Sequence, residues 1–259
     1  NAELVGVTTI EEYAFFDCTY LQSANIINVI TIEDYAFSSC GLTSLTFGNN
    51  LATIGKHSFE YCVALTCQLE FPTSLQTIDQ YAFGGCYGII GKLVIPSSVT
   101  SLGAGAFNGC SKLSEEIDIR ANITTINEDT FRGCTSATKL IIVDGVEVIG
   151  SNAFRGCRSL NGGLNLPNTI THIQNGAFNG CYGITQIHLP DSVITIGNSA
   201  FANCNGMTEL TLGQNVSSVG RSAFAECTRL LFVNIGGGIE SLDSEVFSNC
   251  SNVLEYYFM

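Results

Sequence analysis

Apolar residues return along this chain in one fixed order that repeats every 22 to 24 residues. Each period holds two apolar residues separated by one outward position, then two aliphatic residues three apart, then Phe and, three residues later, Cys. Val193, Ile196, Phe201 and Cys204 show the second half of the pattern. The alternating pair predicts a short strand with one buried face, and the rest predicts turns and extended chain.

The aromatic and sulfur positions of the repeat are the most regular. The phenylalanines of the repeat are Phe15, Phe37, Phe59, Phe83, Phe107, Phe131, Phe154, Phe178, Phe201, Phe224 and Phe247. The cysteines three residues later are Cys18, Cys40, Cys62, Cys86, Cys110, Cys134, Cys157, Cys181, Cys204, Cys227 and Cys250. Such a period indicates a solenoid, because one unit cannot bury its apolar face and stacked neighbours can.

Each repeat therefore predicts a strand, a turn, an extended aliphatic segment, a second turn, and a short helical or 3-10 turn at Ala-Phe-x-x-Cys. The strands pair in parallel about 4.8 Å apart. Glycine often follows the second aliphatic residue, which favours a turn near positive φ. Those glycines are Gly55, Gly103, Gly150, Gly197 and Gly220. We expect a mixed α/β-type but mostly β solenoid of about eleven repeats. Residues 1–259 would form a single domain that starts and ends inside a repeat, with Tyr256 and Phe258 in the inward positions of an eleventh strand.

The stretch from Leu189 to Cys204 reads Leu-Pro-x-Ser-Val-x-x-Ile-Gly-x-x-Ala-Phe-x-x-Cys, and Ile95 to Cys110 differs only by Leu102 in the Ile position and Ile95 in the Leu position. This run resembles the BspA-type (Treponema pallidum-type) leucine-rich repeat, over nearly all of residues 7–259. The resemblance implies a right-handed, curved leucine-rich-repeat solenoid with a parallel sheet on its concave face. Members of this family are typically secreted or cell-surface proteins of bacteria and some protists, implicated in adhesion. A cell-surface or secreted location is therefore implied.

The twelve cysteines leave three interpretations. An even count suits a disulfide framework in a secreted chain. Equivalent side chains of stacked strands, however, lie about 4.8 Å apart in register, whereas a disulfide needs Cβ atoms about 3.5–4.5 Å apart that face each other. No Cys-x-x-Cys or Cys/His cluster indicates a metal. We favour a ladder of buried thiols. Cys67, outside the register, is the cysteine to watch for reactivity or intermolecular pairing.

The charge of the chain disfavours some classes of partner. The formal net charge is −13, and residues 1–55 hold six acids and no Lys or Arg. An acidic surface disfavours nucleic acid and anionic membranes as partners. No apolar run approaches the roughly 18 residues of a membrane span. Because the chain starts at Asn1 without an initiator Met, we expect a processed product or a fragment.

The outward positions of the predicted strands define the expected binding face, since solenoids bind partners on such surfaces. The candidate partner-binding residues on this concave face are Glu70, Val94, Asp118, Ile141, His188 and Phe232. Val94, Ile141 and Phe232 would be exposed apolar anchors for a protein ligand.

No constellation indicates an enzyme, a cofactor or a metal. His57, His172 and His188 stand apart, and none is paired with a nucleophile at a meaningful spacing. We therefore expect a non-enzymatic surface or secreted module for protein–protein interaction or adhesion. Its ligand would be a protein or glycoprotein, such as an extracellular-matrix or cell-surface protein. The alternative is a structural scaffold or filament that self-associates through repeat ends or edges.

Overall fold

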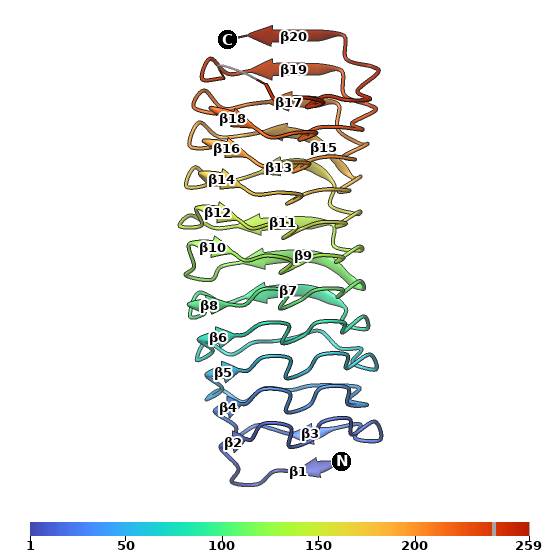
Figure 1. The fold of residues 1–259 in the computed structure, drawn as a ribbon. Helices are drawn as coiled ribbons and strands as arrows, with labels where there is room; N and C mark the ends of the chain where they lie inside the picture. Colours follow the sequence, from blue (N-terminus) through green and yellow to red (C-terminus); the bar gives the residue numbers. More distant parts are fainter. Residues whose placement is uncertain (240–241, 259) are drawn as a thin grey trace. The chain divides into compact units, whose positions relative to one another are not determined.

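The structure is a computed structural model that describes residues 1–239 and 242–258, and there it contains strands and turns but no helix (Figure 1). The chain divides into two compact units. Unit 1 comprises residues 1–123 and 130–137, and unit 2 comprises residues 124–129 and 138–259. Each unit is a stack of coils, and each coil supplies one rung to each of two sides. The predicted mostly β repeat solenoid is confirmed.

Unit 1 carries short strands on one side and longer strands or extended chain on the other. The short strands are β2 (Thr9–Ile10), β4 (Thr31–Ile32), β5 (Thr53–Ile54), β6 (Thr77–Ile78) and β8 (Ser101–Leu102), and they pair in parallel in this order. The strands of the other side are β1 (Ala2–Glu3), β3 (Ala24–Asn25), β7 (Gly91–Ile95) and β9 (Leu113–Ile119).

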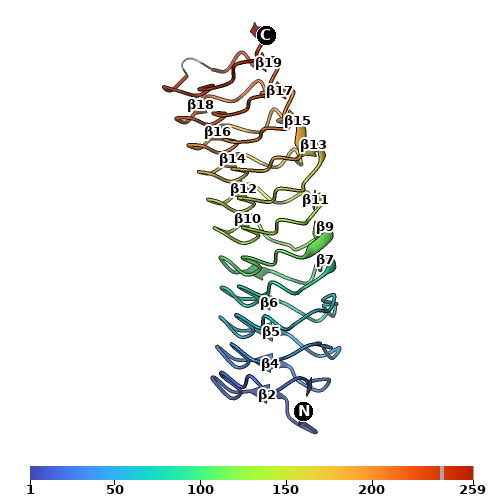
Figure 2. The same ribbon diagram turned by 90° about the vertical axis from the view of Figure 1, so that its right-hand side faces the viewer.

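Unit 2 repeats this arrangement. Its short strands, paired in parallel, are β10 (Thr125–Ile126), β12 (Val148–Ile149), β14 (His172–Ile173), β16 (Thr195–Ile196) and β18 (Ser218–Val219). Its long strands are β11 (Lys139–Ile142), β13 (Gly162–Asn165), β15 (Ile184–His188), β17 (Glu209–Thr211), β19 (Phe232–Ile235) and β20 (Glu255–Phe258). Figure 2 shows that the short and long strands of unit 2 occupy different sides of its coils.

The core of each unit lies between its two sides. Inward residues of both strand sets meet there, for example Ile187 and Leu210 of the long strands and Ile196 of a short strand, all nearly inaccessible. Phe178 stacks between Phe154 and Phe201 at ring-centroid distances of 5.2 Å on each side. The phenylalanines of the repeat therefore stack in the core, and we call this row the phenylalanine spine. Tyr256 takes its predicted inward position, since it pairs in register with the buried Val233 and its ring centroid lies 5.7 Å from that of Phe247, although the side chain is 47% exposed. The side chain of Phe258 lies outside the described residues.

The Ala-Phe-x-x-Cys segment is not helical, which corrects the sequence-based prediction. In one coil the N–H groups of Gly176, Phe178 and Gly180 donate to carbonyls of the next coil at 2.9, 2.7 and 2.9 Å. The N–H groups of Ala177, Asn179 and Cys181, which alternate with them, donate three residues back within their own coil at 2.9 to 3.3 Å. Alternate amides must therefore point along the stack. Left-handed residues such as Gly176 (φ 64°) and Gly180 (φ 75°) produce this alternation and interrupt any helix.

The glycines after the second aliphatic residue are not explained by the predicted turn near positive φ. None of them has positive φ. A Cβ atom added at Gly103 would lie 2.3 Å from the backbone nitrogen of Gln80 in the preceding coil, and one at Gly197 would lie 2.6 Å from that of Asn175. Glycine is needed here because the backbones of successive coils approach closely.

The cysteines form the predicted ladder of thiols, and no described cysteine forms a disulfide. Nine Sγ atoms lie 2.8 to 3.4 Å from the carbonyl oxygen of the phenylalanine in the preceding coil, to which the S–H group donates. The donors are Cys40, Cys62, Cys86, Cys110, Cys134, Cys181, Cys204, Cys227 and Cys250. The carbonyl already accepts a backbone N–H within its own coil, as that of Phe178 does from Cys181, and the S–H group adds a second donor. A small apolar residue with a weak donor therefore suits the position.

Native-state alkylation with iodoacetamide at pH 8 should modify at most three of the twelve thiols. Cys18 is exposed, Cys67 and Cys250 are half-buried, and the other nine are buried. Burial raises the pKa of Cys40 to about 11 and that of Cys62 to about 12, so almost none of either is thiolate at pH 8. Intact mass measurement counts the adducts, with urea-denatured protein as the control that exposes every thiol. Rapid modification of more than three thiols in the native protein would contradict this arrangement.

Candidate functional site

The long strands of unit 2 present two rows of outward side chains in register. Parallel pairing of β13, β15, β17, β19 and β20 aligns the first row, which consists of Asn165, His188, Thr211, Asn234 and Tyr257. The same pairing aligns the second row, which consists of Gln186, Glu209, Phe232 and Glu255. We call these two rows the long-strand face. His188 and Phe232, both predicted from the sequence, lie on it in different rows.

Side chains of the long-strand face bond to one another along the rows. Gln186 Nε2 donates to Glu209 Oε2 at 3.3 Å, and Asn234 Nδ2 donates to Thr211 Oγ1 at 3.2 Å. Phe232 is 40% exposed beside Glu209, its register partner. The face therefore combines ordered polar groups with two accessible aromatic rings, those of Phe232 and Tyr257.

The other two predicted apolar anchors are less accessible than expected. Ile141 on β11 and Val94 on β7 are both half-buried. Of the three, only Phe232 is largely exposed.

Asp118 corrects the sequence-based expectation of an exposed contact residue. It pairs with Val94 across β7 and β9 but is only 1% exposed. Its Oδ2 accepts from Arg120 Nη2 at 2.7 Å and Nε at 3.0 Å, and Lys92 Nζ lies 3.3 Å away. Lys92 also pairs with Glu116. Strand alternation correctly points Asp118 outward, but these longer side chains help to cover it.

The charge of Asp118 is held in place by that network. Burial alone would raise the pKa of Asp118, but the hydrogen bonds from Arg120 and Lys92 outweigh burial and lower it below its ordinary value. The carboxylate therefore stays charged at neutral pH, although its Oδ1 is buried without a hydrogen-bond partner. Asp118 organises the outer face of β7 and β9 and is not available to a partner.

Glu70 lies in unit 1 on a coil without a long strand. It is exposed and borders an open hollow of about 440 Å³ that Thr46 and Cys67 also line. Cys67 is half-buried, and burial raises its pKa. This environment argues against the reactivity that we considered for Cys67, because the thiolate is the reactive form.

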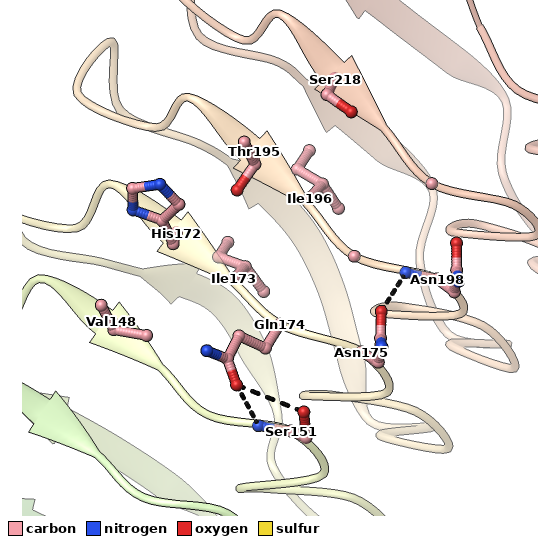
Figure 3. Close-up of a pocket in the computed structure, with 12 residues that line it drawn as sticks. Val148, Ser151, His172, Ile173, Gln174, Asn175, Thr195, Ile196, Asn198 and Ser218 are labelled. Carbon is pink, nitrogen blue, oxygen red and sulfur yellow. Dashed lines mark hydrogen bonds between the residues drawn. The ribbon is translucent and has the colours of Figure 1, made fainter.

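A second candidate surface, which the sequence analysis missed, is a groove on the short-strand side of unit 2 (Figure 3). It is open to solvent and has a volume of about 620 Å³. We call it the short-strand groove. Its lining comprises Val148, Ser151, His172, Ile173, Gln174, Asn175, Thr195, Ile196, Gly197, Asn198, Ser218 and Gly220.

Missing side chains create the short-strand groove. Outward residues of β12, β14, β16 and β18 form a row in register that includes His172, Thr195 and Ser218. The position two residues further along each coil is Gln174 in one coil, but Gly150 in the coil before it and Gly197 and Gly220 in the two coils after it. Since Gly197 and Gly220 leave backbone bare beside the long side chain of Gln174, the groove that these three residues line is hollowed there.

Hydrogen bonds fix the direction of the amide groups around the groove. Gln174 Oε1 accepts from the backbone N–H and hydroxyl of Ser151 at 3.1 and 3.2 Å. Asn175 Oδ1 accepts from the N–H of Asn198 at 2.8 Å, and Asn198 Oδ1 accepts from that of Arg221 at 2.8 Å. Each amide oxygen is occupied, so each NH₂ group is left as the outward donor. In the described part of the chain no protein acceptor bonds to these three NH₂ groups.

A signal for this groove was present in the sequence. Glycine occupies the same repeat position at Gly197 and Gly220, directly after a coil with Gln174. We interpreted these glycines as turn residues, and that interpretation does not consider the side chains of the neighbouring coils. The groove was therefore missed. The three histidines lie in different places. His172 lines the groove and His188 lies on the long-strand face. His57 stacks between Tyr35 and Tyr81 in unit 1.

Within the described residues, no three His, Cys, Asp or Glu side chains cluster in a way that could hold a metal ion. None of the described segments is a helix of the length and apolarity that crossing a bilayer requires.

The repeat region matches a known protein family. The profile of the family described as BspA type Leucine rich repeat region (6 copies) matches residues 4–114, 30–161 and 124–254. No curated protein matches the chain.

Three solved structures are similar in fold. A leucine-rich repeat protein from Bacteroides ovatus is 22% identical, with a TM-score of 0.60 over 98% of this chain and 76% of its own. The pneumococcal vaccine antigen PcpA is 21% identical, with a TM-score of 0.56 over 97% of this chain and 66% of its own. A leucine-rich repeat protein from Eubacterium ventriosum is 21% identical, with a TM-score of 0.52 over 98% of this chain and 65% of its own.

Proposed function

We propose, from the premise that this chain belongs to the BspA-type leucine-rich repeat family, that it is a non-enzymatic adhesion module that binds a protein or glycoprotein at the cell surface or after secretion. Leucine-rich repeat proteins are generally protein-interaction modules. PcpA, one of the structures similar in fold, is described as a vaccine antigen, which supports an exposed location.

The observation that carries the proposal is the composition of the long-strand face. Its two rows hold Phe232 and Tyr257, which are 40% and 47% exposed, among polar side chains that are already ordered by bonds to one another. Exposed aromatic residues within a polar rim are the usual anchors of protein interfaces. Ordered neighbours lower the entropy lost on binding. We place the protein contact on this face, with Phe232 as its anchor and His188 in the adjoining row.

Replacement of Phe232 by aspartate should weaken ligand binding by about 30-fold or more, because an interface anchor contributes about 2 kcal/mol or more. The measurement is biosensor binding to a panel of immobilised extracellular-matrix and cell-surface glycoproteins. Ile194→Asp is the matched control, since Ile194 is 41% exposed in the same unit and lies outside the long-strand face. Both variants should keep the wild-type melting temperature within a few degrees.

Equal loss in the two variants, or unchanged binding in Phe232→Asp, would move the contact off the long-strand face. The scaffold alternative has its own test. Light scattering should show a monomer across the concentration range of the binding assay. Concentration-dependent polymers would favour a filament-forming role over a binding module.

A further inference from the structure

We infer that the short-strand groove of unit 2 is a binding site for an uncharged oligosaccharide. The groove lies on the opposite strand set from the long-strand face, so this site is additional to the proposed protein contact and does not depend on it. Its polar groups, its lack of charge and its regular spacing all point to the same class of ligand.

The hydrogen-bonding groups of the groove are mostly donors. The oxygens of Gln174, Asn175 and Asn198 accept backbone N–H groups, so the NH₂ groups of these exposed side chains are the parts left to bond a ligand. The hydroxyls of Thr195 and Ser218 add groups that both donate and accept. A ligand that fits must offer several acceptors and some donors at close intervals, which is the pattern of sugar hydroxyl and ring oxygens.

Charge restricts the ligand further. None of the described residues that line the groove is Asp, Glu, Lys or Arg. A phosphate, sulfate or carboxylate ligand is normally met by Arg, Lys or a helix N-terminus. A basic ligand is normally met by carboxylates. The groove offers neither, so a neutral ligand leaves no charge unpaired.

An extended peptide fits the groove less well. Peptides that add to a sheet bond to an open strand edge, whereas β14 and β16 each have a strand on both sides. Peptides also need pockets for side-chain anchors. Ile173 and Ile196 beneath this groove are only 1% and 2% exposed, and the third apolar side chain of the lining, Val148, is half-buried. The groove therefore has no strand edge and no apolar pocket for a peptide to use.

The spacing of the groove suits a polymer of sugars. Equivalent side chains recur from coil to coil at the inter-strand distance of about 4.8 Å, which is close to the length of one pyranose residue in an extended chain. Successive coils can therefore each address one sugar. A volume of about 620 Å³ accommodates a short oligosaccharide rather than a single monosaccharide.

The test uses an array of neutral hexasaccharides of the gluco-, manno-, xylo- and N-acetylglucosamine series, with sulfated and uronic-acid chains as the charged arm. We expect at least one neutral series to bind, and ligand-observed NMR titration to give its affinity. Asn175→Asp and Asn198→Asp keep the oxygen that accepts the backbone N–H but remove the donor. Each should weaken binding about threefold to tenfold, and the double variant more than tenfold. Thr195→Val removes a hydroxyl without changing shape and should act in the same direction.

Asn165→Asp is the matched control, because Asn165 is an exposed asparagine of the same unit on the long-strand face. It should leave saccharide binding unchanged. The inference is overturned if no neutral hexasaccharide binds, if charged chains bind preferentially, or if the groove variants bind like the wild type. Should a variant lower the melting temperature, Gln174→Glu replaces it by the same logic. Phe232→Asp should retain saccharide binding, so failure of the protein contact and failure of this site are separate results.

Discussion

Raising the pH from 8 to 11 should unfold the protein, and the thiol ladder is the reason. Burial raises the pKa of six ladder thiols well above the ordinary thiol range. They are Cys40, Cys62, Cys86, Cys110, Cys181 and Cys204. Among the described residues no disulfide links one coil to another, because none of the described cysteines forms a disulfide. The fold therefore depends on thiols that stay protonated.

The stability of the fold decreases as pH rises, because the folded and unfolded states lose these thiol protons at different pH values. An unfolded thiol has a pKa of about 8.5, whereas burial in the fold raises the pKa of Cys40 to about 11 and the pKa values of Cys62 and Cys204 to about 12. Below pH 8.5 both states hold the proton and stability is unaffected. Above it, only the folded state keeps the proton, so each thiol removes about 1.4 kcal/mol of stability per pH unit until its folded pKa is reached. Six such thiols remove on the order of 8 kcal/mol per pH unit.

Far-UV circular dichroism from pH 7 to 11.5, in a reducing buffer under argon, measures this transition. The total stability of a domain is about 5–15 kcal/mol, and a loss of about 8 kcal/mol per pH unit above pH 8.5 exhausts it between about pH 9 and 10.5, where the midpoint should fall. Cys18→Ser, at an exposed position, should not move the midpoint. Cys204→Ala should make the dependence on pH less steep. A protein still folded at pH 11.5 would show that the thiols do not carry this coupling.

Replacement of Phe178 by alanine should lower the free energy of unfolding of unit 2 by about 4 kcal/mol, because a fully buried aromatic ring leaves a cavity. Phe178 is 0% exposed and loses stacking on both faces, at 5.2 Å from Phe154 and 5.2 Å from Phe201. Urea unfolding followed by circular dichroism gives the change. Tyr182→Ala is the control, since Tyr182 is 43% exposed in the same unit and should cost less than about 1 kcal/mol. Similar losses in the two variants would mean that the spine is not the main source of stability.

The parts of the fold set by burial were predictable from the sequence. The columns of Phe178 and Cys181 follow from the period alone, because only a stack of coils gives these apolar positions a common interior. The left-handed turns were not predictable in this way. Tyr35 has a φ of 57°, yet nothing in that residue type marks a left-handed conformation. The hints were His57 (φ 54°), a residue type that is enriched at positive φ, and the glycines at the equivalent position, Gly105 and Gly176.

The surfaces were less predictable than the core, because they depend on pairs of residues and not on single positions. Strand alternation places Asp118 on the outer side, but its burial depends on Lys92 and Arg120, which come from two places in the sequence. The short-strand groove depends on Gln174 standing beside two coils that carry glycine. A periodic pattern describes what the coils share, and these surfaces arise where neighbouring coils differ.

The alternation of amides at each phenylalanine has an evolutionary consequence. Within each unit, successive coils are joined in the same way, because the phenylalanine N–H of one coil donates to a carbonyl of the next, as Phe178 does to Ala200 and Phe201 does to Ala223. The donating face of one coil is thus complementary to the accepting face of another. Duplication or loss of a stretch of 22 to 24 residues would leave two compatible faces to join. Genes for such chains can change length by whole coils without disturbing the fold, while substitutions at a few outward columns change what the surface binds.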